Sequence, residues 1–141
     1  MTTVAEIMTP NVYTSNMDTP IAQALEVCSQ KGIRHLPIVD DLGELAGLVT
    51  DRDLRYYISP RIGTISENNA DRESLKRPVH LIMIRNTITT TPQASLAEVA
   101  QLMLDHRVGC LVVIDPDRHV IGMITSSDLI RCIAQNRQLI S

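Results

Sequence analysis

The pattern of hydrophobic and polar positions in this chain occurs twice. Residues 7–58 align with residues 82–133 at one constant offset and without a gap. The positions that are identical in both copies include the pairs Asn11 and Asn86, Leu36 and Leu111, Gly47 and Gly122, Thr50 and Thr125, and Asp53 and Asp128. One offset held over about fifty residues indicates internal duplication. We therefore expect two half-domains of the same fold, related by a pseudo-twofold axis.

Each copy predicts three strands. A short extended run opens each copy, and two apolar runs separated by a short polar turn follow, which is the pattern of an antiparallel hairpin. The extended runs are residues 11–15 and 86–90, and the hairpin strands are residues 36–40 with 45–50 and residues 111–115 with 120–125.

Two helices complete each copy, one before the hairpin and one after it. In the first copy Ile21, Leu25 and Cys28 recur at the spacing of one helical face, and Val99 and Met103 do so in the second copy. The helix after the hairpin begins at residue 51 or 126. The predicted fold class is α/β (α+β), with two β-α-β-β-α repeats. Segments of this size bury too little surface alone, so we expect the repeats to share one core.

The repeats also predict the domain boundaries. Residues 1–58 form repeat 1 and residues 81–141 form repeat 2. Residues 59–80 between them are polar and show no hydrophobic periodicity, which predicts an exposed connection with one short helix.

Composition excludes several classes of protein. The net charge is −3 and the basic residues form no stripe, which argues against a nucleic-acid partner. No apolar run approaches the roughly 20 residues of a membrane span. The first residues do not have the pattern of a signal peptide, and the three cysteines lack the spacing of a disulfide framework or a zinc site. These features predict a cytoplasmic protein with reduced thiols.

Catalytic signatures are missing from the sequence. It contains no phosphate-binding P-loop, nucleophile elbow, zinc-protease motif or dinucleotide fingerprint. Its four histidines do not share metal-ligand spacing. We therefore expect no enzymatic activity, no metal and no cofactor.

One motif of the form Gly-h-h-Thr-x-x-Asp, where h is apolar, occurs in both copies at the junction from strand to helix. It spans residues 47–53 and 122–128. One interpretation is a variant capping box that only starts the helix. The other is a ligand site, because a helix N-terminus attracts phosphate and a carboxylate there can bind a ribose diol. Both interpretations can hold together.

The hairpin and motif of each copy resemble a CBS domain. The resemblance rests on residues 36–40 with 47–54 and residues 111–115 with 122–129, and residues 7–9 and 82–84 are similar to the segment that opens such domains. A tandem pair of this kind is called a Bateman module. The resemblance implies a regulatory module that binds AMP, ADP, ATP or S-adenosylmethionine, forms homodimers through its helices and controls an enzyme or transporter.

The resemblance also implies two ligand clefts, each shared between the copies. The Thr-x-x-Asp of one copy holds ribose and phosphate, and the start of the first hairpin strand in the other copy holds adenine. One predicted cleft joins Thr50, Arg52 and Asp53 to Val108, Gly109 and Cys110. The second joins Thr125, Ser127 and Asp128 to Ile33, Arg34 and His35.

The two clefts differ in their predicted adenine walls. The small side chains at 108–110 suit adenine, so we expect the Asp53 cleft to be the stronger. Arg34 and His35 are bulky and basic; they fit either phosphate contacts or a solvated strand end. Arg52 lies in the first helical turn, where the helix dipole disfavours a cation, so it indicates an anionic ligand or an ion pair with Asp51 or Asp53.

An alternative function needs no ligand. In this interpretation the chain is a structural dimerisation module whose clefts are degenerate and empty.

Overall fold

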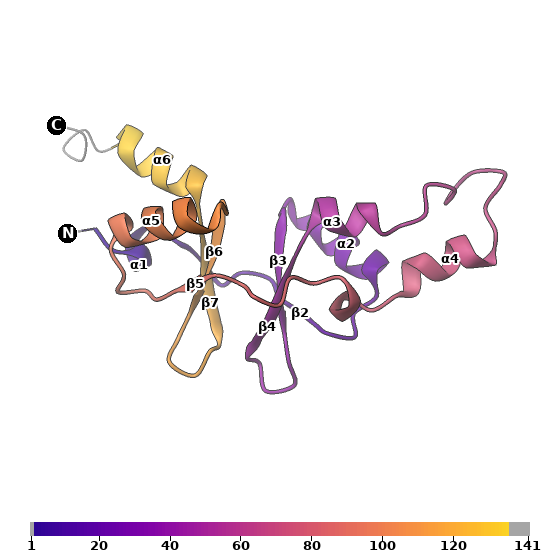
Figure 1. Cartoon of the computed structure of the whole chain (residues 1–141), viewed down its shortest axis with the longest axis horizontal. Coiled ribbons are helices and arrows are strands. Elements are labelled where there is room, and N and C mark those ends of the chain that lie inside the picture. The colour runs from indigo at the N-terminus through magenta and orange to yellow at the C-terminus, as the bar shows by residue number, and fades with distance from the viewer. Residues whose placement is uncertain (1, 136–141) are drawn as a thin grey trace. The chain divides into compact units, whose positions relative to one another are not determined.

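The computed structural model describes residues 2–135, which fall into two compact units. Of the described residues, unit 1 comprises residues 2–12 and 87–135, and unit 2 comprises residues 13–86. Each unit contains the hairpin and flanking helices of one copy (Figure 1). The predicted order of strand, helix, strand, strand and helix is found in both, so the predicted fold class is confirmed.

Unit 2 contains a three-stranded sheet, with one α-helix before the β-hairpin in the sequence and further helices after it. Its strand order is β2-β3-β4, with β2 parallel to β3 and β3 antiparallel to β4. Gly32 ends the first helix with a φ of 64°, a left-handed conformation that glycine adopts without steric cost. The elements are β2 (Ser15–Asn16), α2 (Ile21–Lys31), β3 (His35–Val39), β4 (Leu45–Thr50), α3 (Asp51–Tyr56), α4 (Asn69–Lys76) and the 3-10 helix η1 (Val79–Leu81).

Unit 1 repeats this arrangement with a fourth strand. Its strand order is β1-β7-β6-β5, in which β5 is parallel to β6 and the other neighbours are antiparallel. In both units the hairpin loop lies at the end of the strands away from the helices (Figure 1). The elements are α1 (Val4–Ile7), β1 (Thr9–Pro10), β5 (Thr89–Thr90), α5 (Leu96–His106), β6 (Cys110–Ile114), β7 (Val120–Thr125) and α6 (Ser126–Gln135).

The segment that opens each copy packs on the hairpin of the other copy. Strand β1, from the first copy, pairs with β7 of the second. In the same way Ile84, from the second copy, exchanges two backbone hydrogen bonds with Leu48 of β4, at 3.0 and 2.8 Å. The two copies therefore exchange equivalent edge segments, and each exchanged segment lies in the same unit as the strand with which it pairs.

The exchange explains the glycine of the repeated motif. A Cβ atom at Gly47 would lie 2.7 Å from the Met83 Sδ atom and 2.9 Å from the Ile84 carbonyl oxygen. At Gly122 it would lie 2.7 Å from the Met8 Sδ atom. Both glycines are thus required by the close approach of an exchanged segment and its methionine.

Each unit has its own cluster of buried aliphatic side chains. Each cluster includes residues from the segment that opens the other copy. Val4 is fully buried in the cluster of unit 1, and Val79 and Met83 are buried in the cluster of unit 2. The predicted helical faces are confirmed, since Ile21, Cys28, Val99 and Met103 are buried and the half-buried Leu25 packs against the cluster of unit 2. A core common to both units stays a prediction. The cluster of unit 2 is Ile21, Ala24, Cys28, Leu36, Ile38, Val49, Leu54, Val79 and Met83. That of unit 1 is Val4, Val99, Met103, Leu111, Val113 and Ile124.

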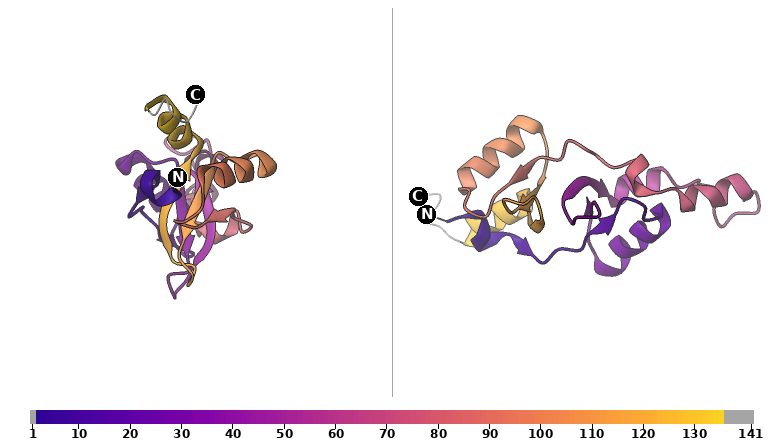
Figure 2. Two further views of the ribbon diagram at one scale, coloured as in Figure 1. Left: turned by 90° about the vertical axis from the view of Figure 1, so that its left-hand side faces the viewer. Right: turned by 90° about the horizontal axis from the view of Figure 1, so that it is seen from below.

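The connection between the copies is polar and contains a short helix, α4, as predicted, but it is not exposed throughout. Asp71 and Ser74 are buried. The Ser59 hydroxyl donates to the Asp71 carboxylate at 2.6 Å, and this bond is the main cause that lowers the Asp71 pKa. The segment before α4 protrudes from unit 2 (Figure 2). Within residues 2–135, no helix combines the length and apolar character needed to cross a bilayer.

Candidate functional site

The Thr-x-x-Asp motif of unit 2 leaves its aspartate carboxylate available. Thr50 ends β4 and caps α3, because its Oγ1 atom accepts a hydrogen bond from the Asp53 backbone N–H at 3.0 Å. The cap uses the backbone of Asp53 and not its side chain. Among residues 2–135, the Asp53 carboxylate has no hydrogen-bond or ion-pair partner.

The equivalent aspartate of unit 1 is fully engaged. Asp128 and Thr125 form a reciprocal capping box: the Thr125 N–H donates to Asp128 Oδ2 at 2.8 Å, and the Asp128 N–H donates to Thr125 Oγ1 at 3.2 Å. Arg131 holds the other carboxylate oxygen, Oδ1, at 3.1 Å. The capping interpretation therefore describes unit 1 completely and unit 2 only in part.

Sequence reasoning missed Arg131, because its counterpart in the first copy is Tyr56 and the repeat comparison gives no signal there. The spacing of three residues from Asp128 was the available clue, since residues three apart are neighbours on a helix surface.

The start of the first hairpin strand lies beside the motif within each unit. In unit 2, His35 pairs with Thr50, and the Arg34 carbonyl accepts the Asp51 N–H at 3.0 Å. In unit 1, Cys110 pairs with Thr125, and the Gly109 carbonyl accepts the Ser126 N–H at 2.9 Å.

The structure thus brings together residues 33–35 with 50–53, and residues 108–110 with 125–128. The predicted clefts pair these groups the other way, across the two units. That pairing stays a prediction.

The two strand starts differ in electrostatics. Burial is the main cause that lowers the pKa of the His35 imidazole; Asp51 opposes this shift and Arg34 adds to it. Burial raises the pKa of the Cys110 thiol to about 12, and the Asp128 carboxylate adds to the shift. At equivalent positions, unit 1 therefore carries the neutral thiol of Cys110 and unit 2 carries the titratable imidazole of His35.

Arg52 is exposed at the start of α3, and no described residue forms an ion pair with it. Its backbone N–H donates to Asp51 Oδ1 at 2.9 Å, but its guanidinium is not engaged there. Of the two explanations for this cation, the ion pair with Asp51 or Asp53 is wrong, and the anionic ligand stays a prediction.

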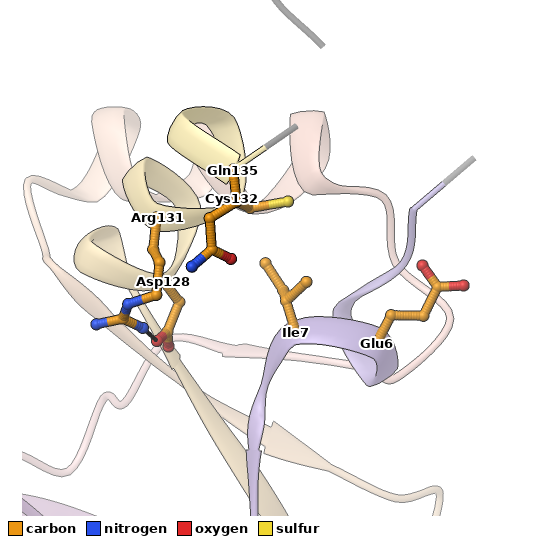
Figure 3. Close-up of a pocket in the computed structure, with 6 residues that line it drawn as sticks. All are labelled: Glu6, Ile7, Asp128, Arg131, Cys132 and Gln135. Carbon is orange, nitrogen blue, oxygen red and sulfur yellow. Dashed lines mark hydrogen bonds and ion pairs between the residues drawn. The ribbon is translucent and has the colours of Figure 1, made fainter. Parts of the chain in front are cut away.

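A cavity of about 280 Å³ lies within unit 1, between α1 and α6 (Figure 3). Asp128 and Arg131 form one end of it, and Glu6 lies toward the other (Figure 3). The Ile7 and Gln135 side chains point toward one another from the two helices, and Cys132 completes the lining. Nothing in the repeat predicted this cavity.

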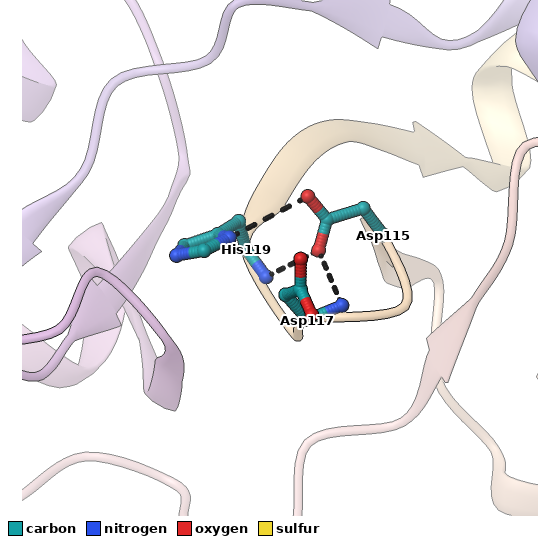
Figure 4. A group of neighbouring side chains, drawn as sticks. All are labelled: Asp115, Asp117 and His119. Atoms are coloured by element: carbon teal, nitrogen blue, oxygen red, sulfur yellow. Dashed lines mark hydrogen bonds and ion pairs between the residues drawn. The ribbon is translucent and has the colours of Figure 1, made fainter.

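One group of side chains has the composition of a metal site. Ligand atoms of Asp115, Asp117 and His119 lie within 4.8 Å of one another in the β6–β7 turn (Figure 4). However, Asp115 Oδ1 accepts the N–H groups of Asp117 and His119, each at 2.9 Å. Asp40 makes the same bonds in the β3–β4 turn, where the partners are Leu42 and Glu44. The aspartate therefore has a structural role that both turns share.

Comparison with known families agrees with the duplicated architecture. The sequence model of the CBS domain family matches residues 4–60 and again residues 79–135. The chain belongs to the CBS domain family. Its two family matches place one CBS domain on each side of the connection that contains α4.

CBS relatives similar to this chain include short and long proteins. A CBS domain-containing protein of Dictyostelium discoideum is 39% identical over 129 residues, which cover 90% of this chain and 88% of that protein. A homoserine O-acetyltransferase of Methanohalobium evestigatum is 35% identical over 134 residues, 95% of this chain but 24% of the enzyme. The chain thus spans about a quarter of that longer relative.

Solved CBS structures resemble the whole chain. The CBS domain pair of protein MJ0100, in complex with 5′-methylthioadenosine and S-adenosyl-L-methionine, has a TM-score of 0.78 and 27% identity, covering 96% of this chain and 98% of that one. CBSX2 in complex with AMP has a TM-score of 0.78 and 26% identity, with the same coverage.

Proposed function

We propose that this CBS pair is a regulatory sensor that binds an adenosine ligand, AMP, ADP, ATP or S-adenosylmethionine, and has no catalytic role of its own. The observation that carries the proposal is the Asp53 carboxylate. It lies at the start of α3 and has no partner among residues 2–135. A half-buried carboxylate without internal bonds is suited to accept the two hydroxyl groups of a ribose.

The proposed cleft around Asp53 has two sides. Thr50, Arg52 and Asp53 hold ribose and phosphate, with the exposed Arg52 guanidinium as the cation for the phosphate. Residues 108–110 form the adenine wall, where the buried, neutral Cys110 thiol provides an apolar surface.

A second proposed cleft combines Thr125, Ser127 and Asp128 with residues 33–35. The Asp128 carboxylate already bonds Arg131 and the Thr125 N–H, so nucleotides bind this second cleft more weakly than the Asp53 cleft. The complexes of similar CBS pairs with AMP, 5′-methylthioadenosine and S-adenosyl-L-methionine support adenosine ligands as a class.

We further propose that the protein is a cytoplasmic homodimer that controls an enzyme or transporter. Longer relatives that carry enzyme names contain a segment similar to this chain, which supports an enzyme as the partner. Large apolar side chains on three helices are exposed and suit a helix-to-helix dimer: Tyr56 is 81%, Leu104 73% and Ile130 66% exposed. The same exposure favours the second candidate function, a dimerisation module with empty clefts.

A thermal-unfolding panel with AMP, ADP, ATP and S-adenosylmethionine separates the two candidates. A ligand at one hundred times its dissociation constant adds about 2.7 kcal/mol to the free energy of unfolding. The sensor requires at least one of the four to raise the melting temperature. No shift at millimolar ligand, together with a dimer in sedimentation, would favour the dimerisation module.

A further inference from the structure

The turn between β6 and β7 brings together three side chains of two chemical kinds (Figure 4). The carboxylates of Asp115 and Asp117 and the imidazole of His119 each place a ligand atom within 4.8 Å of the other two. Asp115 is half-buried, and the other two residues are exposed. The group therefore combines two oxygen donors with one nitrogen donor at alternate positions of a short stretch of chain.

The turn itself does not require this group. In the equivalent turn of unit 2, Asp40 Oδ1 accepts the N–H groups of Leu42 and Glu44 at 2.9 and 3.0 Å. Leu42 and Glu44 occupy the positions of Asp117 and His119. The same backbone bonds therefore form without an aspartate at the first of these positions and without a histidine at the second.

The separation of two ligand atoms fits a metal site better than a hydrogen bond. His119 Nδ1 lies 3.5 Å from Asp115 Oδ2, whereas N–H···O hydrogen bonds usually span about 2.7–3.2 Å. In a tetrahedral site with metal–ligand bonds of about 2.1 Å, neighbouring ligand atoms stand about 3.4 Å apart. Because Oδ1 of Asp115 holds the turn, its Oδ2 atom is the one that faces the imidazole. One aspartate can thus serve both purposes.

Charge at the turn also favours a divalent cation. The Asp115 and Asp117 carboxylates repel each other at this separation, and a protonated imidazole carries only one positive charge. The turn is already formed, since the Arg118 N–H donates to the Asp115 carbonyl at 3.0 Å and Pro116 restricts the backbone between them. An ion that binds here therefore orders little additional backbone.

We propose that Asp115, Asp117 and His119 bind a divalent transition-metal ion, for which Zn²⁺ is the probe. The ligands are Asp115 Oδ2, one carboxylate oxygen of Asp117 and His119 Nδ1, and water completes the coordination. The exposed Asp117 side chain turns toward the other two when the ion binds. An imidazole with carboxylates suits borderline ions such as Zn²⁺, whereas Mg²⁺ and Ca²⁺ prefer ligand sets made of oxygen atoms.

This metal site is separate from the strand-to-helix junctions that carry the proposed function. It lies at the hairpin end away from the helices of unit 1 (Figure 1). The sequence prediction of no metal rested on the spacing of the four histidines. It did not detect a set in which aspartates supply two of the three ligands.

Titration calorimetry of ZnCl₂ into the untagged protein tests the site, with MgCl₂ and CaCl₂ as competitors. The variants are Asp117→Leu, which introduces the residue of the unit 2 turn, and His119→Gln, which retains a polar side chain. The matched control is His106→Gln, which removes an exposed histidine at the end of α5.

We expect the wild type to bind one zinc ion in the presence of excess Mg²⁺ and Ca²⁺. Each turn variant should weaken zinc at least about tenfold, because even residues that only support a metal ligand contribute about tenfold to a hundredfold. His106→Gln should change the affinity by less than about twofold. Wild-type affinity in His119→Gln, or an equal loss in His106→Gln, would overturn the proposal and leave the turn with a surface ion pair alone.

The unit 2 turn offers the converse test. Leu42→Asp combined with Glu44→His gives this turn the ligand set of unit 1 on the same backbone bonds to Asp40. The double variant should bind a second zinc ion. A double variant that still binds only one ion would show that these three side chains on this turn are not sufficient, which contradicts the assignment.

Hydrogen exchange gives a readout that does not depend on any variant. Zn²⁺ should slow exchange in wild-type peptides that cover residues 115–119 and leave residues 40–44 unchanged. Protection around the half-buried Cys132 without protection of the β6–β7 turn would place the ion elsewhere and overturn the proposal.

Discussion

Replacing Gly47 by alanine tests the exchange of opening segments between the two copies. The new Cβ would lie 2.7 Å from Met83 Sδ and 2.9 Å from the Ile84 carbonyl oxygen. The thioether can rotate away, but the carbonyl is held by its hydrogen bond to the Leu48 N–H at 3.0 Å. Relief of the clash therefore separates the exchanged segment from β4.

The expected loss follows from these contacts. Two backbone hydrogen bonds contribute about 0.5–1.5 kcal/mol each. Overpacking of a buried site costs about 1–3 kcal/mol, and alanine regains about 0.4–1 kcal/mol by restricting the unfolded chain. We expect Gly47→Ala to lower the free energy of unfolding by about 2–4 kcal/mol, measured by urea denaturation.

Gly109→Ala is the matched control. At Gly109 the nearest atom, Ser126 Oγ, would lie 3.5 Å from a new Cβ, which is an ordinary contact. Its free energy of unfolding should change by less than about 1 kcal/mol. If the two variants prove equally stable, Met83 and Ile84 do not pack on Gly47 and the exchange is wrong.

Two further predictions concern titratable side chains. Cys28 and Cys110 are buried and burial raises the pKa of both thiols, whereas Cys132 is half-buried. A thiol reagent at neutral pH should therefore modify Cys132 first and the other two cysteines only in denaturant. Rapid modification of all three thiols in the folded protein would contradict the packing. The folded-state pKa of His35 is below its unfolded value of 6.5, so the unfolded chain binds more protons and stability falls as pH drops below 6.5. His35→Gln should remove this part of the pH dependence of the urea midpoint, and an unchanged profile would show that His35 is not responsible.

The regular elements were predictable because local periodicity determines them. The face formed by Ile21 and Cys28 and the apolar run of residues 111–113 could each be identified within a short window, and both are buried. The exchange was not predictable in this way. Nothing local to Thr9 or Ile84 says which hairpin an isolated edge segment pairs with, because the partner strand lies elsewhere in the chain.

The candidate site could be predicted only where the two copies agree. The duplication identified Thr50, Asp53 and their counterparts, and the structure places them at equivalent strand-to-helix junctions. Features that break the repeat gave no signal: Arg131 corresponds to Tyr56, and Glu6 corresponds to Leu81. The difference between an engaged and an available aspartate depends on such unmatched neighbours.

Replacing each motif aspartate by asparagine separates capping from ligand binding. Asp53→Asn keeps the helix cap, because the cap bond uses the backbone N–H at 3.0 Å from Thr50. Asp128→Asn loses the charge in a capping box and in the ion pair with Arg131, and should lower stability by about 1 kcal/mol.

Titration calorimetry of AMP and ATP on the wild type and on Asp53→Asn tests the central claim most directly. Loss of a charge-assisted bond to the ribose weakens binding about tenfold to a hundredfold, while the unfolding midpoint of Asp53→Asn stays at the wild-type value. Asp128→Asn, in the same titration, should change nucleotide affinity less. If Asp53→Asn binds both nucleotides as tightly as the wild type but unfolds more easily, the Thr-x-x-Asp of unit 2 is only a helix cap and the account is contradicted.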